Sequence, residues 1–127
     1  MDLAWAVSVP GRIVSKKNSK RIIRVGRFPR IISSAQYLKF EKEVSVVLRR
    51  HLPPKSIRGK LLFELCVNLK NRQHEPDLSN LLEGPQDVFQ ELGIIENDKQ
   101  IVRIIAEKTF DPALGDMWTA RLYRLED

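Results

Sequence analysis

Residues 61–93 read LLFELCVNLKNRQHEPDLSNLLEGPQDVFQELG and contain a strand pattern followed by a helix pattern. In the first part, apolar residues occupy every second position: Leu61, Phe63, Leu65, Val67 and Leu69. A period of two is typical of a β-strand. The positions between them are also partly apolar, so we expect this strand to lie inside the sheet.

The second part predicts a helix that begins near Pro76 and stops at Gly93, because proline suits the first helical position and glycine the end. On a wheel of about 100° per residue the apolar side chains gather on one arc. The opposite arc carries possible oxygen ligands: Asp77, Asn80, Glu83 and Asp87. Pro85 has no N–H to donate, so we expect a kink or a break at Gly84–Pro85.

Outward from this stretch, the pattern predicts strands over residues 3–9, 101–110 and 117–125, and a basic hairpin around Gly26. A second helix begins at Ser33–Ser34, with Ser33 and Gln36 as a capping box, and ends before Pro53. Residues 111–116 resemble a hairpin turn that joins the last two strands. We expect one domain over residues 1–127, α+β, with a mixed, mainly antiparallel sheet and two main helices packed on it.

The charge of the chain is unevenly distributed. Its net charge is +6, and residues 12–30, which we name the basic lobe, carry eight Lys or Arg and no acid, so the rest sums to 6 − 8 = −2. This favours nucleic acid as a partner over a merely solubilising loop. No stretch is long and apolar enough for a membrane span, and no signal peptide is evident. The single cysteine, Cys66, fits a strand residue of a cytoplasmic protein.

A short acidic turn follows the predicted helix and contains Glu96 and Asp98. If this turn folds back toward the helix start, one of these acids meets Asp77. Carboxylates that lie together repel each other unless a cation neutralises them, and oxygen ligands without thiolates suit Mg²⁺ or Mn²⁺. The alternative is an acidic helix face that is simply solvated.

The order of these motifs resembles the RusA family of Holliday-junction resolvases. The resemblance rests on Pro76-Asp77-Leu78-Ser79-Asn80-Leu81, Asp87, Gly93 and Ile95-Glu96-Asn97-Asp98-Lys99-Gln100-Ile101, and near the start on Lys16-Lys17-Asn18-Ser19-Lys20 and the Ser34–Tyr37 pair. By this resemblance Asp77 matches the first metal-binding acid and Asp98 the acid of the later turn. Asn80 and Asp87 match as well.

Three positions depart from the family pattern. Ser79 stands where a second metal-binding Asp is expected, Glu83 replaces a catalytic Lys, and Asn97 replaces the first acid of an Asp-Asp pair. Glu83 lies on the acid-bearing arc, so we hypothesise that it supplies the carboxylate that Ser79 lacks. Glu75 and Glu96 are further possible contributors. Lys99 and the residues of the basic lobe are candidate substitutes for the missing lysine.

The resemblance implies a homodimeric, Mg²⁺- or Mn²⁺-dependent endodeoxyribonuclease that resolves four-way DNA junctions in recombination and repair. The expected metal-binding acids are Asp77, Asp98, Glu83 and Asp87, of which the first three are expected to be catalytic. The expected DNA-binding residues are Lys16, Lys17, Asn18, Lys20, Arg21, Arg24, Arg27 and Asn80. The alternatives are a branched-DNA-binding protein that does not cleave, and a metal-dependent nuclease with another nucleic-acid substrate.

Overall fold

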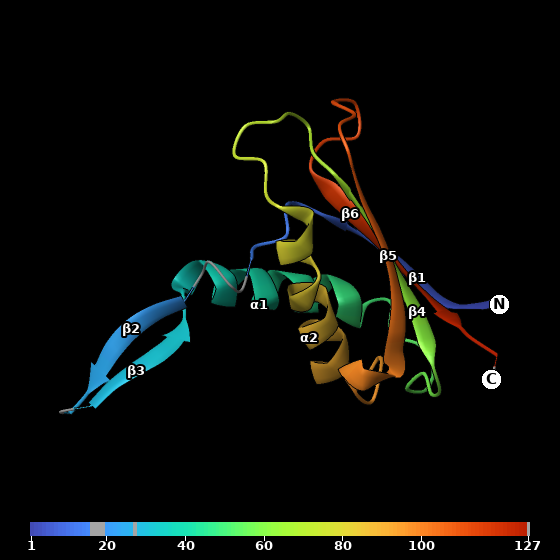
Figure 1. Cartoon of the computed structure of the whole chain (residues 1–127), viewed down its shortest axis with the longest axis horizontal. Helices are drawn as coiled ribbons and strands as arrows, with labels where there is room; N and C mark the ends of the chain where they lie inside the picture. The colour runs from blue at the N-terminus through green and yellow to red at the C-terminus, as the bar shows by residue number, and fades with distance from the viewer. Residues whose placement is uncertain (16–19, 27, 127) are drawn as a thin grey trace.

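The computed structural model describes residues 1–15, 20–26 and 28–126, and for residues 20–25 and 28–33 it describes the backbone alone. A four-stranded sheet carries two helices on one face (Figure 1). The strand order is β1 (Asp2–Pro10), β6 (Met117–Arg124), β4 (Leu61–Asn68) and β5 (Ile101–Thr109). β4 pairs parallel with β5, whereas the other two pairings are antiparallel. The predicted α+β class, with a mixed and mainly antiparallel sheet, is confirmed.

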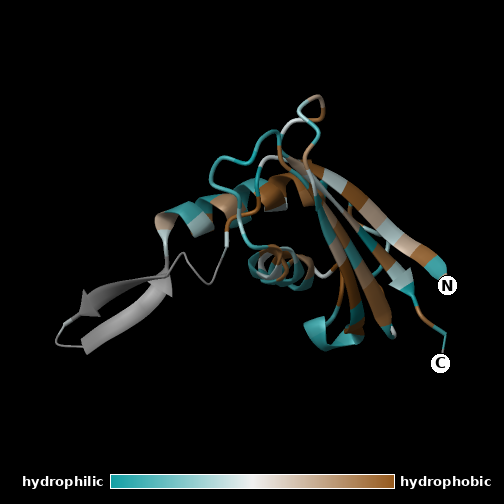
Figure 2. Ribbon diagram, turned by 45° about the horizontal axis from the view of Figure 1, so that its top comes forward, coloured by the Kyte–Doolittle hydropathy of each residue, from teal (hydrophilic) through white to brown (hydrophobic). Residues whose placement is uncertain are grey.

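β4 is an interior strand, as its sequence predicted. Leu61, Phe63 and Leu65 on the helix side are fully buried. The ring of Phe89 packs edge-on against Phe63 at 5.6 Å and against Trp5 at 5.3 Å. Apolar residues continue along the strands of the sheet (Figure 2). The core therefore lies between the sheet and the helices.

The last two strands do not form a hairpin, so that expectation was wrong. β5 and β6 lie on opposite sides of β4, and the connection between them crosses the end of β4. Asn68, the last residue of β4, holds this connection with its side-chain amide, whose Nδ2 donates to the carbonyl oxygens of Asp111 at 2.9 Å and Gly115 at 2.7 Å. The crossing lets β6 enter the sheet between β1 and β4, where its apolar face is buried.

Helix α1 (Ala35–Arg49) begins one residue later than the predicted capping box. Its N-cap is Ser34, whose Oγ accepts the N–H of Tyr37 at 3.1 Å, so Ser33 is not the cap. Strands β2 (Lys20–Val25) and β3 (Phe28–Ser33) pair antiparallel and lie beyond the first turn of α1, away from the sheet (Figure 1). The predicted hairpin is confirmed. In the part of the chain that the structure describes, no helix is long and apolar enough to cross a membrane.

The second predicted helix is divided in two. A 3₁₀ turn, η1 (Leu78–Leu81), is followed by helix α2 (Glu83–Glu91). The break falls at Leu82, two residues before the position predicted for it, Gly84–Pro85. Pro85 falls in the first turn of α2, where no helical N–H is needed. Because the axis is interrupted, Asp77 does not share one helical face with Glu83 and Asp87.

Candidate functional site

Asp77 is exposed at the start of η1, and the chain that leads to it is attached to β5. The carbonyl oxygen of Asp77 accepts the N–H of Asn80 at 3.0 Å. The ammonium of Lys108 on β5 donates to the carbonyl oxygen of Pro76 at 3.0 Å and to Oε2 of Glu75 at 2.7 Å. The hydrogen bond from Lys108 lowers the pKa of Glu75. Lys108 therefore ties the residues just before Asp77 to β5, and no local pattern in the sequence had indicated this.

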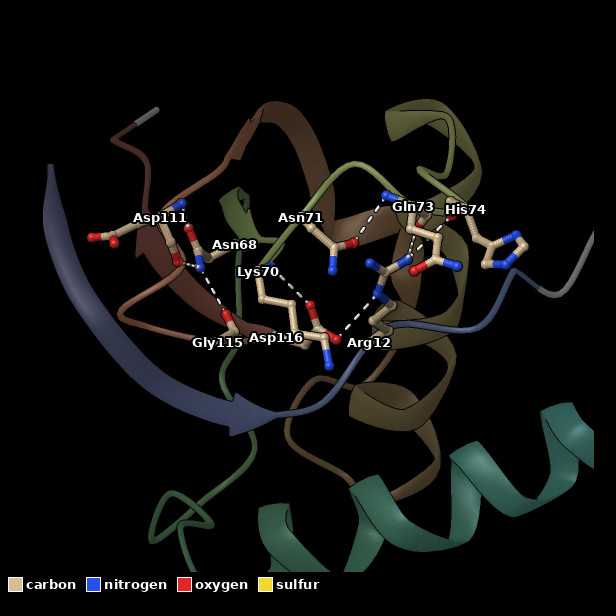
Figure 3. Close-up of polar contacts among 9 residues, drawn as sticks. All are labelled: Arg12, Asn68, Lys70, Asn71, Gln73, His74, Asp111, Gly115 and Asp116. Carbon is tan, nitrogen blue, oxygen red and sulfur yellow. Dashed lines mark hydrogen bonds and ion pairs between the residues drawn. The ribbon is translucent and has the colours of Figure 1, made fainter.

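The loop before Asp77 is also held from the other side (Figure 3). The guanidinium of Arg12 contacts Asp116 Oδ2 at 3.2 Å and donates to the carbonyl oxygens of Gln73 and His74 at 2.9 and 3.2 Å. The backbone N–H of Lys70 donates to Asp116 Oδ1 at 2.9 Å. That hydrogen bond, with the nearby guanidinium, lowers the pKa of Asp116. Arg12 belongs to the basic lobe by sequence, but it braces this loop.

The acidic turn with Asp98 forms a second 3₁₀ turn, η2 (Asp98–Gln100). The N–H of Asp98 donates to Oε1 of Gln90, in the last turn of α2, at 2.9 Å. The amide of Gln100 donates to the carbonyl oxygens of Ile57 at 2.9 Å and Gly59 at 3.1 Å. These contacts hold the turn at the C-terminal end of α2, so it does not fold back toward the start of η1.

Asp77, at the start of η1, and Asp98, at the start of η2, consequently lie at opposite ends of β5. Lys108, next to Pro76, and Ile101, directly after η2, are seven residues apart in this strand. At about 3.3 Å per residue, that separation is about 23 Å. One metal ion cannot bind both carboxylates of the same chain.

Glu83 and Asp87 lie near helix α1 instead. Tyr37 of α1 is buried, and its pKa is raised by that burial and by the negative charges of Glu41, Asp87 and Glu83. Its hydroxyl has no hydrogen-bond partner within the described part of the chain. The negative charges of Glu83 and Asp87 on α2 therefore act on Tyr37 of α1.

A divalent metal ion held by the protein alone needs several ligands around one point. Among the described residues, no three His, Cys, Asp or Glu side chains lie close enough together to hold one metal ion. Mg²⁺ usually binds one or two protein carboxylates and completes its shell with water and phosphate oxygens. An exposed acid such as Asp77 fits an open site of this kind, whereas the described residues form no closed protein cage.

Of the eight expected DNA-binding residues, four lie in the part of the chain that the structure describes. Lys20, Arg21 and Arg24 belong to β2 of the projecting hairpin, and Asn80 is half-buried in η1. Lys16, Lys17, Asn18 and Arg27 lie outside the described residues.

An α+β domain from which a basic hairpin projects has the charge distribution expected of a nucleic-acid-binding protein. The sequence matches the family model described as Endodeoxyribonuclease RusA over residues 10–115 of 127. The chain therefore belongs to the RusA family of endodeoxyribonucleases, and the resemblance found in its motifs is confirmed. No curated protein matched the chain.

Proposed function

We propose that this protein is a structure-selective endodeoxyribonuclease that resolves four-way DNA junctions during recombination and repair. The observation that carries the proposal is the family match, which spans residues 10–115 and includes Asp77 and Asp98. The reaction is hydrolysis of a phosphodiester bond, with Mg²⁺ or Mn²⁺ as the required ion.

In this proposal Asp77 is the first metal-binding acid. A bound divalent ion would activate water and stabilise the charge that develops on the phosphate. The chain's own contribution is to hold Asp77 in place: Lys108 fixes the preceding peptide, and Arg12 and Asp116 brace the loop before it. Glu83 and Asp87 remain candidate helpers. The basic lobe contacts the DNA backbone, because phosphate contacts position a protein on DNA.

We also propose that the active form is a homodimer. A four-way junction offers two equivalent strands, and a two-fold dimer offers two equivalent sites. Supporting this, β5 is an edge strand with exposed apolar side chains: Val102 at 56%, Ile104 at 40% and Ile105 at 51%. Apolar edge strands favour pairing with another chain. Because Asp77 and Asp98 are far apart in one chain, a site that uses both takes Asp98 from the second copy.

The first experiment is cleavage of a mobile four-way junction in Mg²⁺ and then Mn²⁺, beside a linear duplex of the same sequence. We expect paired symmetric nicks in the junction that are lost in Asp77→Asn. Asp2→Asn is the matched control, since Asp2 is an exposed acid at the start of β1. Equal cutting of the linear duplex would instead indicate a nuclease with another substrate.

Mixing two inactive variants tests the shared site. Asp77→Asn and Asp98→Asn are each expected to abolish cleavage. A mixed dimer of the two retains one intact composite site if each site takes its two acids from different copies, and nicking of one strand should return. If both acids act within one copy, the mixture stays inactive.

A second candidate function is a junction-binding protein that does not cleave. Ser79 and Glu83 favour it, because the family pattern has an acid and a lysine at these two positions. Junction binding without nicks in either metal would support this function. In that case Ser79→Asp with Glu83→Lys restores both family residues, and a gain of nicking would identify them as the cause.

A further inference from the structure

A second basic segment lies outside the basic lobe. Residues 49–60 carry five Lys or Arg, one His and no acid. The basic lobe contributes +8 and this segment +5, so the remainder of the chain sums to 6 − 8 − 5 = −7. The positive excess of the chain is therefore concentrated in two short segments, and the remaining residues together are net negative.

The β2–β3 hairpin of the basic lobe and residues 49–60 lie at opposite ends of α1. The β2–β3 hairpin lies beyond its first turn, and residues 49–60 run from its last residue to the start of β4 (Figure 1). The helix has 15 residues. At about 1.5 Å per residue its length is about 22 Å. Phosphates of one DNA strand follow each other at about 3.4 Å along the axis, so that length corresponds to about six base pairs.

The second basic segment forms one wall of a groove with a volume of about 830 Å³. Lys55 and Arg58 line it from the segment, and Arg124 lines it from the end of β6. The one acid in the lining is Glu96, whose Oε1 lies 3.1 Å from Arg58 Nε. The Arg58 side chain is 85% exposed in this ion pair, and such solvated pairs contribute little. A phosphate can therefore replace Glu96 as the partner of Arg58 at small cost.

We propose that residues 49–60, together with Arg124, form a second phosphate-binding surface that contacts a duplex arm of the DNA. The identity of the polyanion rests on the proposed function. The basic lobe and this surface together span α1, so a duplex that lies along the helix is bound at both ends. This arrangement gives the protein an orientation on the arm that a single basic hairpin does not provide.

The test compares affinity for a four-way junction over a range of salt concentrations. Arg58→Gln removes one charge from the groove, and Arg121→Gln is its matched control on the sheet face away from the helices. The triple variant Lys55→Gln, Arg58→Gln and Arg124→Gln removes all three. Each lost phosphate contact reduces the slope of log affinity against log salt by about 0.9, so the triple variant should lose about 2.7. Arg121→Gln should keep the wild-type slope.

Glu96→Gln provides a prediction of opposite sign, since it removes the negative charge from the groove and should tighten binding. The inference fails if the triple variant binds the junction with wild-type affinity and slope. Thermal unfolding of each variant checks that the fold persists, as is expected for exposed side chains.

Linear duplex and immobilised heparin separate this inference from the proposed function. If the wild type does not prefer the junction but the triple variant is weaker on every polyanion, the proposed substrate fails and the second surface stands. If the wild type cuts junctions and the triple variant binds all three probes unchanged, the second surface alone is refuted.

Discussion

Replacing Asn68 by alanine removes the side chain that holds the β5–β6 connection across the end of β4. Asn68 is only 4% exposed. Its Nδ2 donates to two carbonyl oxygens, of Asp111 and Gly115, at 2.9 and 2.7 Å. Its Oδ1 accepts from Thr109 Oγ1 at 2.7 Å and from the N–H of Asp111 at 3.0 Å. All four hydrogen-bonding positions of the amide are in use.

Four such bonds contribute about 1 kcal/mol each, and water can replace some of them at the surface of the loop, so we expect a loss of about 3 kcal/mol in the free energy of unfolding. Urea unfolding should show a lower midpoint with an unchanged slope. Asn71→Ala is the control, because exposed Asn71 accepts one N–H, that of Gln73, at 2.9 Å, and its loss should cost less than about 1 kcal/mol. Equal losses in Asn68→Ala and Asn71→Ala would refute the assigned role of Asn68.

Three further predictions concern ionisable groups. The N–H of Lys70 lowers the pKa of Asp116 from its ordinary 3.8. The ionised Asp116 carboxylate therefore stabilises the fold above pH 3.8, and this stabilisation is lost as the pH falls through the lowered pKa. The difference in unfolding free energy between wild type and Asp116→Asn should shrink in acid, and a constant difference would contradict this. Burial raises the pKa of the Cys66 thiol above 9.0, so the folded protein should react with a disulfide reagent at pH 8 more slowly than the urea-unfolded chain. Lys108→Met removes the hydrogen bond that lowers the pKa of Glu75, and an NMR titration should show that pKa rising; no change would mean that the contact does not persist in solution.

Local patterns in the sequence were sufficient for much of the fold. The period of two in residues 61–69 identified β4 as a buried strand, and Pro53 with the apolar spacing of residues 37–48 bounded α1. Both signals depend on neighbouring residues, which is why they can be read without knowing the tertiary structure. The family motif around Asp77 was equally visible, because its residues are close together in the chain.

Only the tertiary structure decided which strands pair and which charges meet. Hydrophobic periodicity shows that a face is buried but not which strand lies beside it. The prediction that β5 and β6 form a hairpin was therefore wrong, because β4 lies between them in the sheet. The same limit applies to charges. The separation of Asp77 from Asp98, the approach of Lys108 to Pro76 and the joining of Arg124 to residues 49–60 all link distant parts of the chain. Contacts of this kind depend on how the sheet and helices pack as a whole, because no local pattern records them.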